Sequence, residues 1–123
     1  MAIIQTLTTS FKVEVAQGLH NFGASTTAYT AAGEASGTNY TAGGIVLTNI
    51  TPTFQGTTAY WTFDTATFTN VTLTTNGALI YNSTNGNRSV AVLNFGVNIS
   101  KTAQNLVITF PAADATNAVL RIA

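Results

Sequence analysis

The chain has 123 residues, no cysteine, and four basic against four acidic side chains, so its formal net charge is zero. The lack of cysteine excludes disulfides and thiolate metal sites, and the lack of a basic stripe argues against nucleic-acid binding. Hydrophobic residues make up 46% of the chain and charged residues only 7%. Charge is what keeps soluble proteins apart, so we expect one domain whose surface is partly covered by partners.

Residues 3–9, near the N-terminus, predict a first strand or an extended arm. They lack the basic start and apolar core of a signal peptide, and no apolar run is long enough to span a membrane, so we expect synthesis in the cytoplasm and no membrane binding. Residues 10–18, SFKVEVAQG, alternate cleanly like a strand. A two-turn helix capped by Ser10 and ended by Gly18 fits the same residues equally well.

Small residues dominate positions 20–44, which indicates a long loop with at most a short strand at 27–30. Phe22, Tyr29 and Tyr40 are its isolated aromatic side chains. They could form a sugar-binding platform or insert into a subunit interface, and we favour the interface because tyrosine combines apolar area with a hydrogen-bonding hydroxyl.

Three predicted strands and two predicted turns follow in order. Residues 45–50 predict a strand ended by Pro52, and Gln55-Gly56 predicts a turn. Residues 58–64 alternate strictly and place Trp61 in the core. Residues 69–74 predict a strand with Val71 and Leu73 inward, followed by a turn at Asn76-Gly77.

The stretch from 77 to 96 organises the chain, because it predicts two apolar strands joined by the polar turn 82–87. Both strands are apolar on both faces, which suggests a central hairpin covered on one side by a facing sheet and on the other by a sheet or a subunit. Beyond it we expect a loop at 98–105, a strand at 106–110 and, after a turn at 114–117, a last strand at 118–122.

Seven or eight short strands with frequent turns predict a mainly all-β fold, either a β-sandwich or a jelly-roll-like barrel. The whole chain, 1–123, forms one β domain with an N-terminal arm of about residues 1–9 and a small-residue loop of about 20–44. The candidate core residues are Trp61, Phe63, Ile80, Val92, Leu93 and Ile108.

No catalytic residue, cofactor site or metal site is predicted. His20 is the sole histidine and has no second ligand type near it in the sequence. The four carboxylates fall in different predicted elements, and the chain contains neither a GxSxG elbow nor a phosphate-binding glycine loop. The sequence thus argues against an enzyme.

The chain resembles a family of small structural proteins of tailed bacteriophages. The resemblance covers nearly the whole chain and rests on SFK with QGLHNF at 10–22, AYT with GE and GTNYTAGG at 28–44, GALIYN at 77–82, and FPAADATNAVLRIA at 110–123. Family members usually have a more helical segment at 11–17, which favours the helix there. Many also carry a strand-like insertion between Phe22 and Thr26 that this chain lacks.

The resemblance implies a non-enzymatic virion protein, and the leading role is a capsid decoration, or cement, protein on the outside of the head. Its expected partners are the major capsid protein and itself, as a homotrimer or alternatively a dimer. The candidate contacts are Ile3 and Ile4 of the arm and Phe22, Tyr29 and Tyr40 of the loop. The competing hypothesis is a tail or fibre component that binds a host receptor such as a surface glycan.

Overall fold

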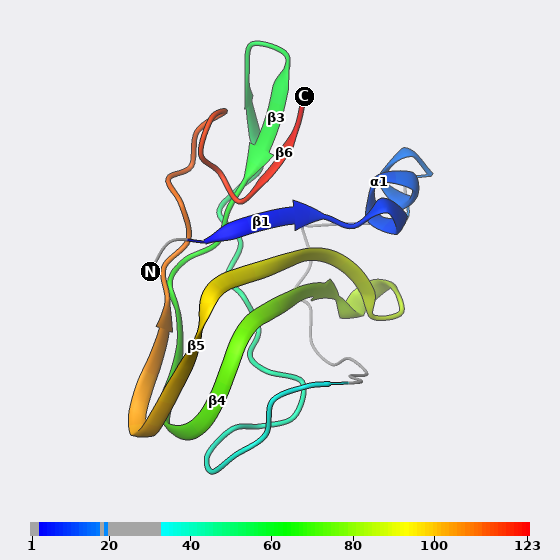
Figure 1. Ribbon diagram of the computed structural model, residues 1–123. Helices are drawn as coiled ribbons and strands as arrows, with labels where there is room; N and C mark the ends of the chain where they lie inside the picture. The colour runs from blue at the N-terminus through cyan, green and yellow to red at the C-terminus, as the bar shows by residue number, and fades with distance from the viewer. Residues whose placement is uncertain (1–2, 18, 20–32) are drawn as a thin grey trace.

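The computed structural model describes residues 3–17, 19 and 33–123, and the fold in these residues is built mainly from strands. Two antiparallel sheets of three strands each form it, in the orders β1-β5-β4 and β2-β3-β6 (Figure 1). The elements are β1 (Ile4–Leu7), α1 (Thr9–Ala16), β2 (Thr53–Gln55), β3 (Thr58–Trp61), β4 (Ala66–Asn82), the 3-10 turn η1 (Ser83–Asn85), β5 (Arg88–Ile108) and β6 (Leu120–Ile122). The mainly all-β fold is therefore confirmed, with two open sheets in place of a closed barrel.

The predicted hairpin is the largest feature of the fold. β4 and β5 pair along most of their length, and the polar turn predicted between them is η1. The side chain of Asn82 accepts a hydrogen bond from the Thr84 amide at 3.1 Å, and Gly86 closes the turn at φ 72°. These are the local bonds and the left-handed backbone that favour a reversal. β5 is central in its sheet, but β4 lies at an edge, so only one strand of the hairpin is central.

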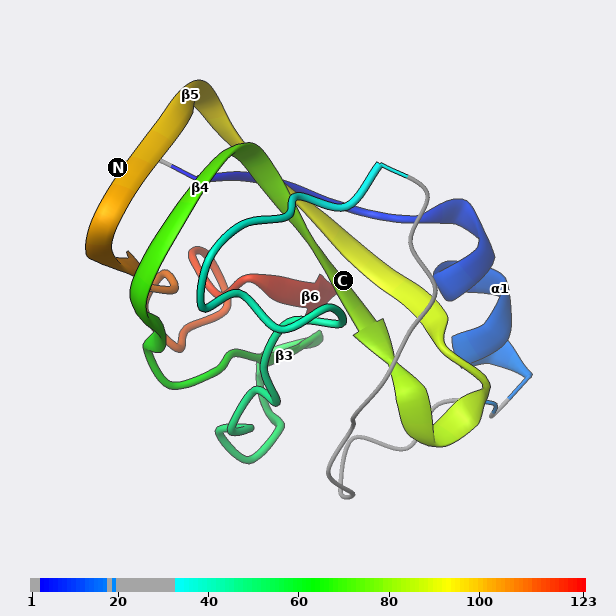
Figure 2. The same ribbon diagram turned by 90° about the horizontal axis from the view of Figure 1, so that it is seen from below.

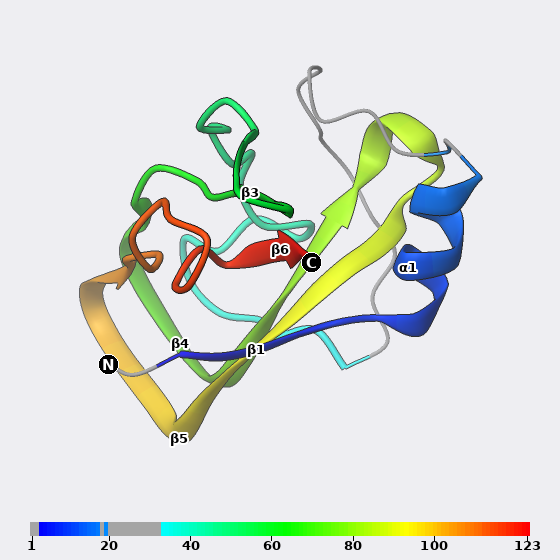
Figure 3. The same ribbon diagram turned by 90° about the horizontal axis from the view of Figure 1, so that it is seen from above.

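The hairpin is also longer than expected and folds through a sharp corner (Figures 2 and 3). Residues 95–98 of β5 lie opposite the single residue Asn76 of β4, because Thr75 pairs with Ile99 and Gly77 with Asn94. A large bulge of this kind bends a ribbon without ending it. The predicted turn at Asn76-Gly77 is therefore wrong, since β4 continues through both residues.

Gly77 is required at this corner because the partner strand passes close to its Cα. A Cβ atom built on Gly77 would lie 2.5 Å from the carbonyl oxygen of Leu93, which is a backbone atom that cannot move aside alone. We expect Gly77→Ala to lower the free energy of unfolding by about 1–3 kcal/mol, as overpacking does in other cores. Urea denaturation measures the loss.

Gly33→Ala is the matched control, because a Cβ there would meet nothing within 4 Å, although φ is +79°. That variant carries only the cost of a left-handed backbone, about 1 kcal/mol. Equal losses in the two variants would mean that the close approach at Gly77 is relieved by a shift of the strand.

The predicted loop at 98–105 is wrong as well, because these residues belong to β5. Side-chain bonds hold the strands together where the register slips. The Asn70 amide donates to the Asn105 side chain and the Ala103 amide donates to the Thr72 hydroxyl, both at 2.9 Å. The Asn and Thr side chains therefore link the two strands where their pairing is irregular, although a segment rich in these residues is typical of a loop.

The N-terminal arm forms an edge strand and a helix. β1 pairs with β5, and α1 follows it directly, so the helix favoured by the resemblance is present. The capping hydroxyl is that of Thr8, which accepts the Phe11 amide at 3.2 Å; Ser10, the expected cap, lies inside the helix. Phe11 is fully buried in the core and holds α1 against the sheets.

The core lies between the two sheets. Trp61, Phe63, Ile80, Leu93 and Ile108 all belong to its main cluster. A smaller cluster contains Val71, Leu73 and Leu106.

The prediction that Val92 belongs to the core is wrong, because this side chain is 48% exposed. Ile80 pairs with Ala91 and Tyr81 with Ser89, which leaves Val90 as an extra residue in β5. This bulge lets both Val90 and Ala91 be buried. From Ala91 onward the side chains alternate, so Leu93 and Phe95 are buried and Val92 points to the opposite face.

The second sheet is smaller. Its β2–β3 hairpin turns at Gly56, as the Gln55-Gly56 pair predicts, and β6 completes it at the C-terminus. The strand predicted at 45–50 is wrong: only an isolated bridge joins Asn49 to Phe63. Bonds from the Ile50 and Asp64 amides flank that bridge, so the segment is extended but lacks a continuous partner strand. The described residues contain six strands in place of the seven or eight short ones expected: β4 and β5 are long, and the other four have three or four residues each.

Candidate functional site

The described residues contain no group of three or more His, Cys, Asp or Glu side chains that could hold a metal ion. Asp114 accepts the Thr116 and Asn117 amides at 2.8 and 2.6 Å, and the Asn117 side chain lowers the pKa of this carboxyl most strongly. Its role is therefore the turn predicted at 114–117. His20 lies outside the described residues.

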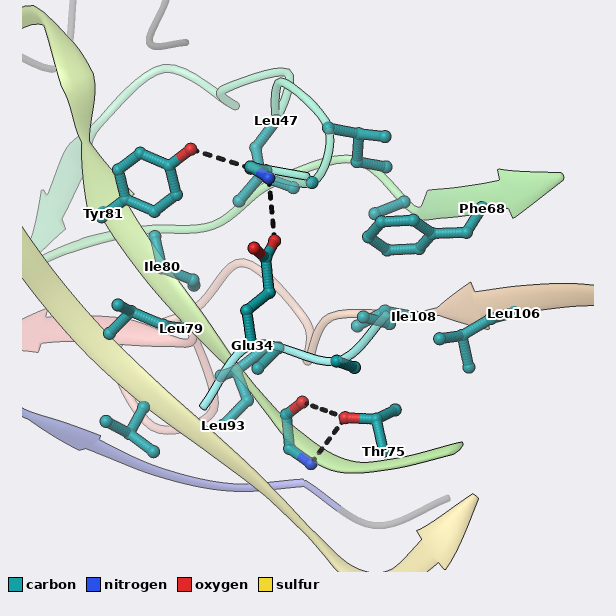
Figure 4. Close-up of a pocket in the computed structure, with 18 of the residues that line it drawn as sticks. Glu34, Leu47, Phe68, Thr75, Leu79, Ile80, Tyr81, Leu93, Leu106 and Ile108 are labelled. Carbon is teal, nitrogen blue, oxygen red and sulfur yellow. Dashed lines mark hydrogen bonds between the residues drawn. The ribbon is translucent and has the colours of Figure 1, made fainter. Parts of the chain in front are cut away.

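A mainly apolar cavity of about 850 Å³ opens in the described structure (Figure 4). It lies between the loop at 33–47 and the bent hairpin. Side chains from β4 and β5 surround it together with Leu47, and they include Phe68, Ile80, Leu93, Leu106 and Ile108. Its volume falls in the range of small-molecule pockets.

A short polar network holds the loop over this cavity. The Glu34 carboxylate accepts the Tyr40 hydroxyl at 2.6 Å and the Gly43 amide at 2.8 Å. The Tyr81 hydroxyl donates to the Gly43 carbonyl at 2.8 Å. Burial raises the pKa of the Tyr81 phenol, and the negative charge of Glu34 acts in the same direction, so this hydroxyl stays protonated and remains a donor. The network thus fastens the loop to β4.

A partly solvent-exposed apolar surface on the β1-β5-β4 sheet is continuous with the cavity, whose lining includes Leu79 and Val92. Thr6, Val92 and Leu79 form one cross-strand row, and Ile4 lies in the next row on the same face. Ile4 is 67% exposed, and Val92 and Leu79 are each 48% exposed. We call Ile4, Leu79 and Val92 the outer sheet face. Rigid strands hold these aliphatic side chains in fixed positions, which suits docking to another protein.

Of the predicted contact residues, Ile4 lies on the outer sheet face, whereas Ile3 packs against the core. Tyr40 is half-buried, stacks on Phe68 with ring centroids 5.7 Å apart, and bonds to Glu34. The structure therefore gives Tyr40 a role within the domain, in holding the loop. Phe22 and Tyr29 lie outside the described residues, so their contact role stays a prediction.

Sequence reasoning missed Leu79 and Val92 as surface residues. Both lie in continuous apolar runs, which suggest burial on both faces. The only signal that could have identified them is the alternation of side chains along the strands: if Leu93 points into the core, Val92 and Leu79 point to the opposite face.

The chain matches no protein-family model, no curated protein and no solved structure. In the described residues no helix is long and apolar enough to cross a membrane. The case for a function therefore depends on the side chains of this chain and on the resemblance noted from its motifs.

Proposed function

We propose that the protein is a non-enzymatic capsid decoration protein of a tailed bacteriophage, which binds the outside of the head through the outer sheet face. The observation that carries this proposal is the set of three exposed aliphatic side chains, Ile4, Leu79 and Val92, held on one face of a rigid sheet. The surrounding chain has zero net charge, so electrostatic repulsion does not oppose docking.

A cement protein must add contact area between neighbouring capsid subunits and still be soluble before assembly. Three aliphatic side chains per copy are a small patch, below the size that makes monomers aggregate. Many identical copies on one shell multiply a modest interface into a large stabilisation of the particle. The proposed partners are the major capsid protein and further copies of this chain, on the virion surface.

The alternative, a tail or fibre protein that binds a glycan, requires exposed aromatic rings beside carboxylates or amides. Of the tyrosines considered for that role, Tyr40 is half-buried and bonded to Glu34. Trp61 is buried in the core. These positions favour the capsid role over the glycan role.

Cryo-electron microscopy of the intact particle tests the proposal. We expect density for this chain in many copies on the capsid surface, with β1, β4 and β5 turned toward the shell. Density confined to the tail tip or fibres would refute the capsid role and would make the glycan role the one to pursue.

A further inference from the structure

The β2-β3-β6 sheet projects from the body of the domain like a finger (Figure 1). Its cross-strand rows show which side chains share a face. Trp61 pairs with Leu120, and both are buried against the core. The next row on the same face contains Phe54, Ala59 and Ile122. The core-facing side of the finger therefore continues past the core into solvent.

Phe54 is the most exposed large hydrophobic side chain of the described residues, at 74%, and Ile122 is 39% exposed. The row Phe54-Ala59-Ile122 lacks a covering layer in the described structure, although the neighbouring row on the same face, Trp61 and Leu120, is buried. An aromatic side chain held out on a paired strand is a strong candidate for an interface anchor.

A recess lies at the base of the finger, between α1 and the C-terminal strand. Its walls include Leu7, Phe11, Val15 and Ile122, and its volume is about 220 Å³. Ile122 belongs both to this recess and to the exposed row. The recess is smaller than the roughly 300–1,000 Å³ of small-molecule pockets, so it fits one large side chain better than a free ligand.

We propose that Phe54 of one copy inserts into the Leu7-Phe11-Val15-Ile122 recess of a second copy. This inference rests on the proposed function, which requires copies of the chain to contact one another, and it names the contact. The finger and the recess lie on one continuous apolar face. Two copies can therefore insert Phe54 into each other's recess, or three copies can do so in turn around a closed ring.

A second copy doubles the contact, because each chain carries both the finger and the recess. Burying a mostly exposed phenylalanine removes roughly 150 Å² of its surface, and the recess wall loses a similar area. Two reciprocal insertions therefore bury on the order of 600 Å², a substantial share of the 1,200–2,000 Å² of a stable interface. Ala59, Ile122 and the flanks of the finger contribute further area.

Charge does not oppose the contact. Of the described residues that line the recess, Arg121 is the one cation, and its guanidinium donates to the Thr116 carbonyl of its own chain. The chain has zero net charge, so two copies approach without net repulsion.

The first test is the mass of the full-length chain in solution, by sedimentation or light scattering across micromolar concentrations. We expect oligomers of two or three chains. In the Phe54→Ser variant the association constant should be at least about tenfold lower. Val97→Ser is the matched control, because Val97 is 63% exposed but lies at the hairpin corner. A monomeric native chain, or equal weakening by both variants, would overturn the inference.

The second test uses the absence of native cysteine. An Ala59→Cys chain, which keeps Phe54, is mixed with a tagged Ala123→Cys chain. Ala59 is exposed beside Phe54 in the same row, and Ala123 is exposed and borders the recess. Under mild oxidation we expect a mixed disulfide between the two chains, and much less when Val97→Cys replaces Ala59→Cys. Equal cross-linking by both pairs would contradict the insertion.

These outcomes are separable from those of the proposed function, because both experiments use the isolated chain without particles. A monomeric chain that still binds the capsid would defeat the inference and leave the decoration role intact. Oligomers of the chain that are found on the tail would support the inference and defeat the decoration role.

Discussion

Leu93→Ala is expected to lower the free energy of unfolding by about 2–5 kcal/mol, whereas Val92→Ala, one residue away, should cost less than about 1 kcal/mol. Leu93 is 1% exposed and belongs to the main core cluster, so its truncation leaves a cavity. Val92 is 48% exposed on the opposite face and loses little buried area. In a domain of this size the larger loss lowers Tm by on the order of 10 °C.

Urea denaturation of both variants, followed by the fluorescence of the single tryptophan, measures the difference. Trp61 lies in the same core cluster as Leu93, so its emission reports the unfolding of that core. Similar losses in the two variants would mean that Val92 is covered in solution, by a subunit or by another segment. Repeating the measurement at several protein concentrations separates these cases, because only a subunit makes the loss concentration-dependent.

The features that the sequence predicted well are those encoded locally. The polar run at 82–87 reverses the chain through its own side-chain bonds, as at Asn82 and Thr84, whatever the rest of the fold does. The alternation around Trp61 correctly places Trp61 and Phe63 in the core, but the strand predicted at 58–64 ends at Trp61, and Thr62 is buried as well. Asp114 and Asn117 close their turn through bonds within four residues.

The features that the sequence did not predict depend on register between distant strands. Nothing near Asn76-Gly77 distinguishes a tight turn from a bulged corner, because the difference lies in residues 95–98 on the other strand. Val92 was misplaced for a related reason: the bulge at Val90 sets which face it occupies. Residues 98–105 have the composition of a loop and become a strand only because β4 lies beside them.

The candidate site was predicted only in small part. Ile4 was expected as a contact and does lie on the outer sheet face. Phe54 was not singled out, because its neighbours Thr53 and Gln55 are polar and the segment is short. Its importance follows from the register with Ala59 and Ile122, which places three apolar side chains in one row beyond the core.

A Val92→Lys variant is expected to bind particles that lack this protein at least about a hundredfold more weakly than the native chain does, which corresponds to about 2.7 kcal/mol. Val92 lies in the middle strand of the outer sheet face, beside Leu79 in the register. A lysine there would have to lose its hydration against an apolar partner surface, and an unpaired charge in such a place is costly.

Val107→Lys is the matched control for this variant. Val107 is the same residue type on the same strand with a similar exposure of 45%, but it lies on the other arm of the hairpin, beyond the corner at Gly96. Both variants should keep the thermal stability of the native chain to within a few degrees, since both side chains are substantially exposed. Loss of binding in Val107→Lys alone would move the docking surface to the far arm. Full binding by both variants would show that the capsid is contacted by neither arm of β5, and the outer sheet face would lose its proposed role.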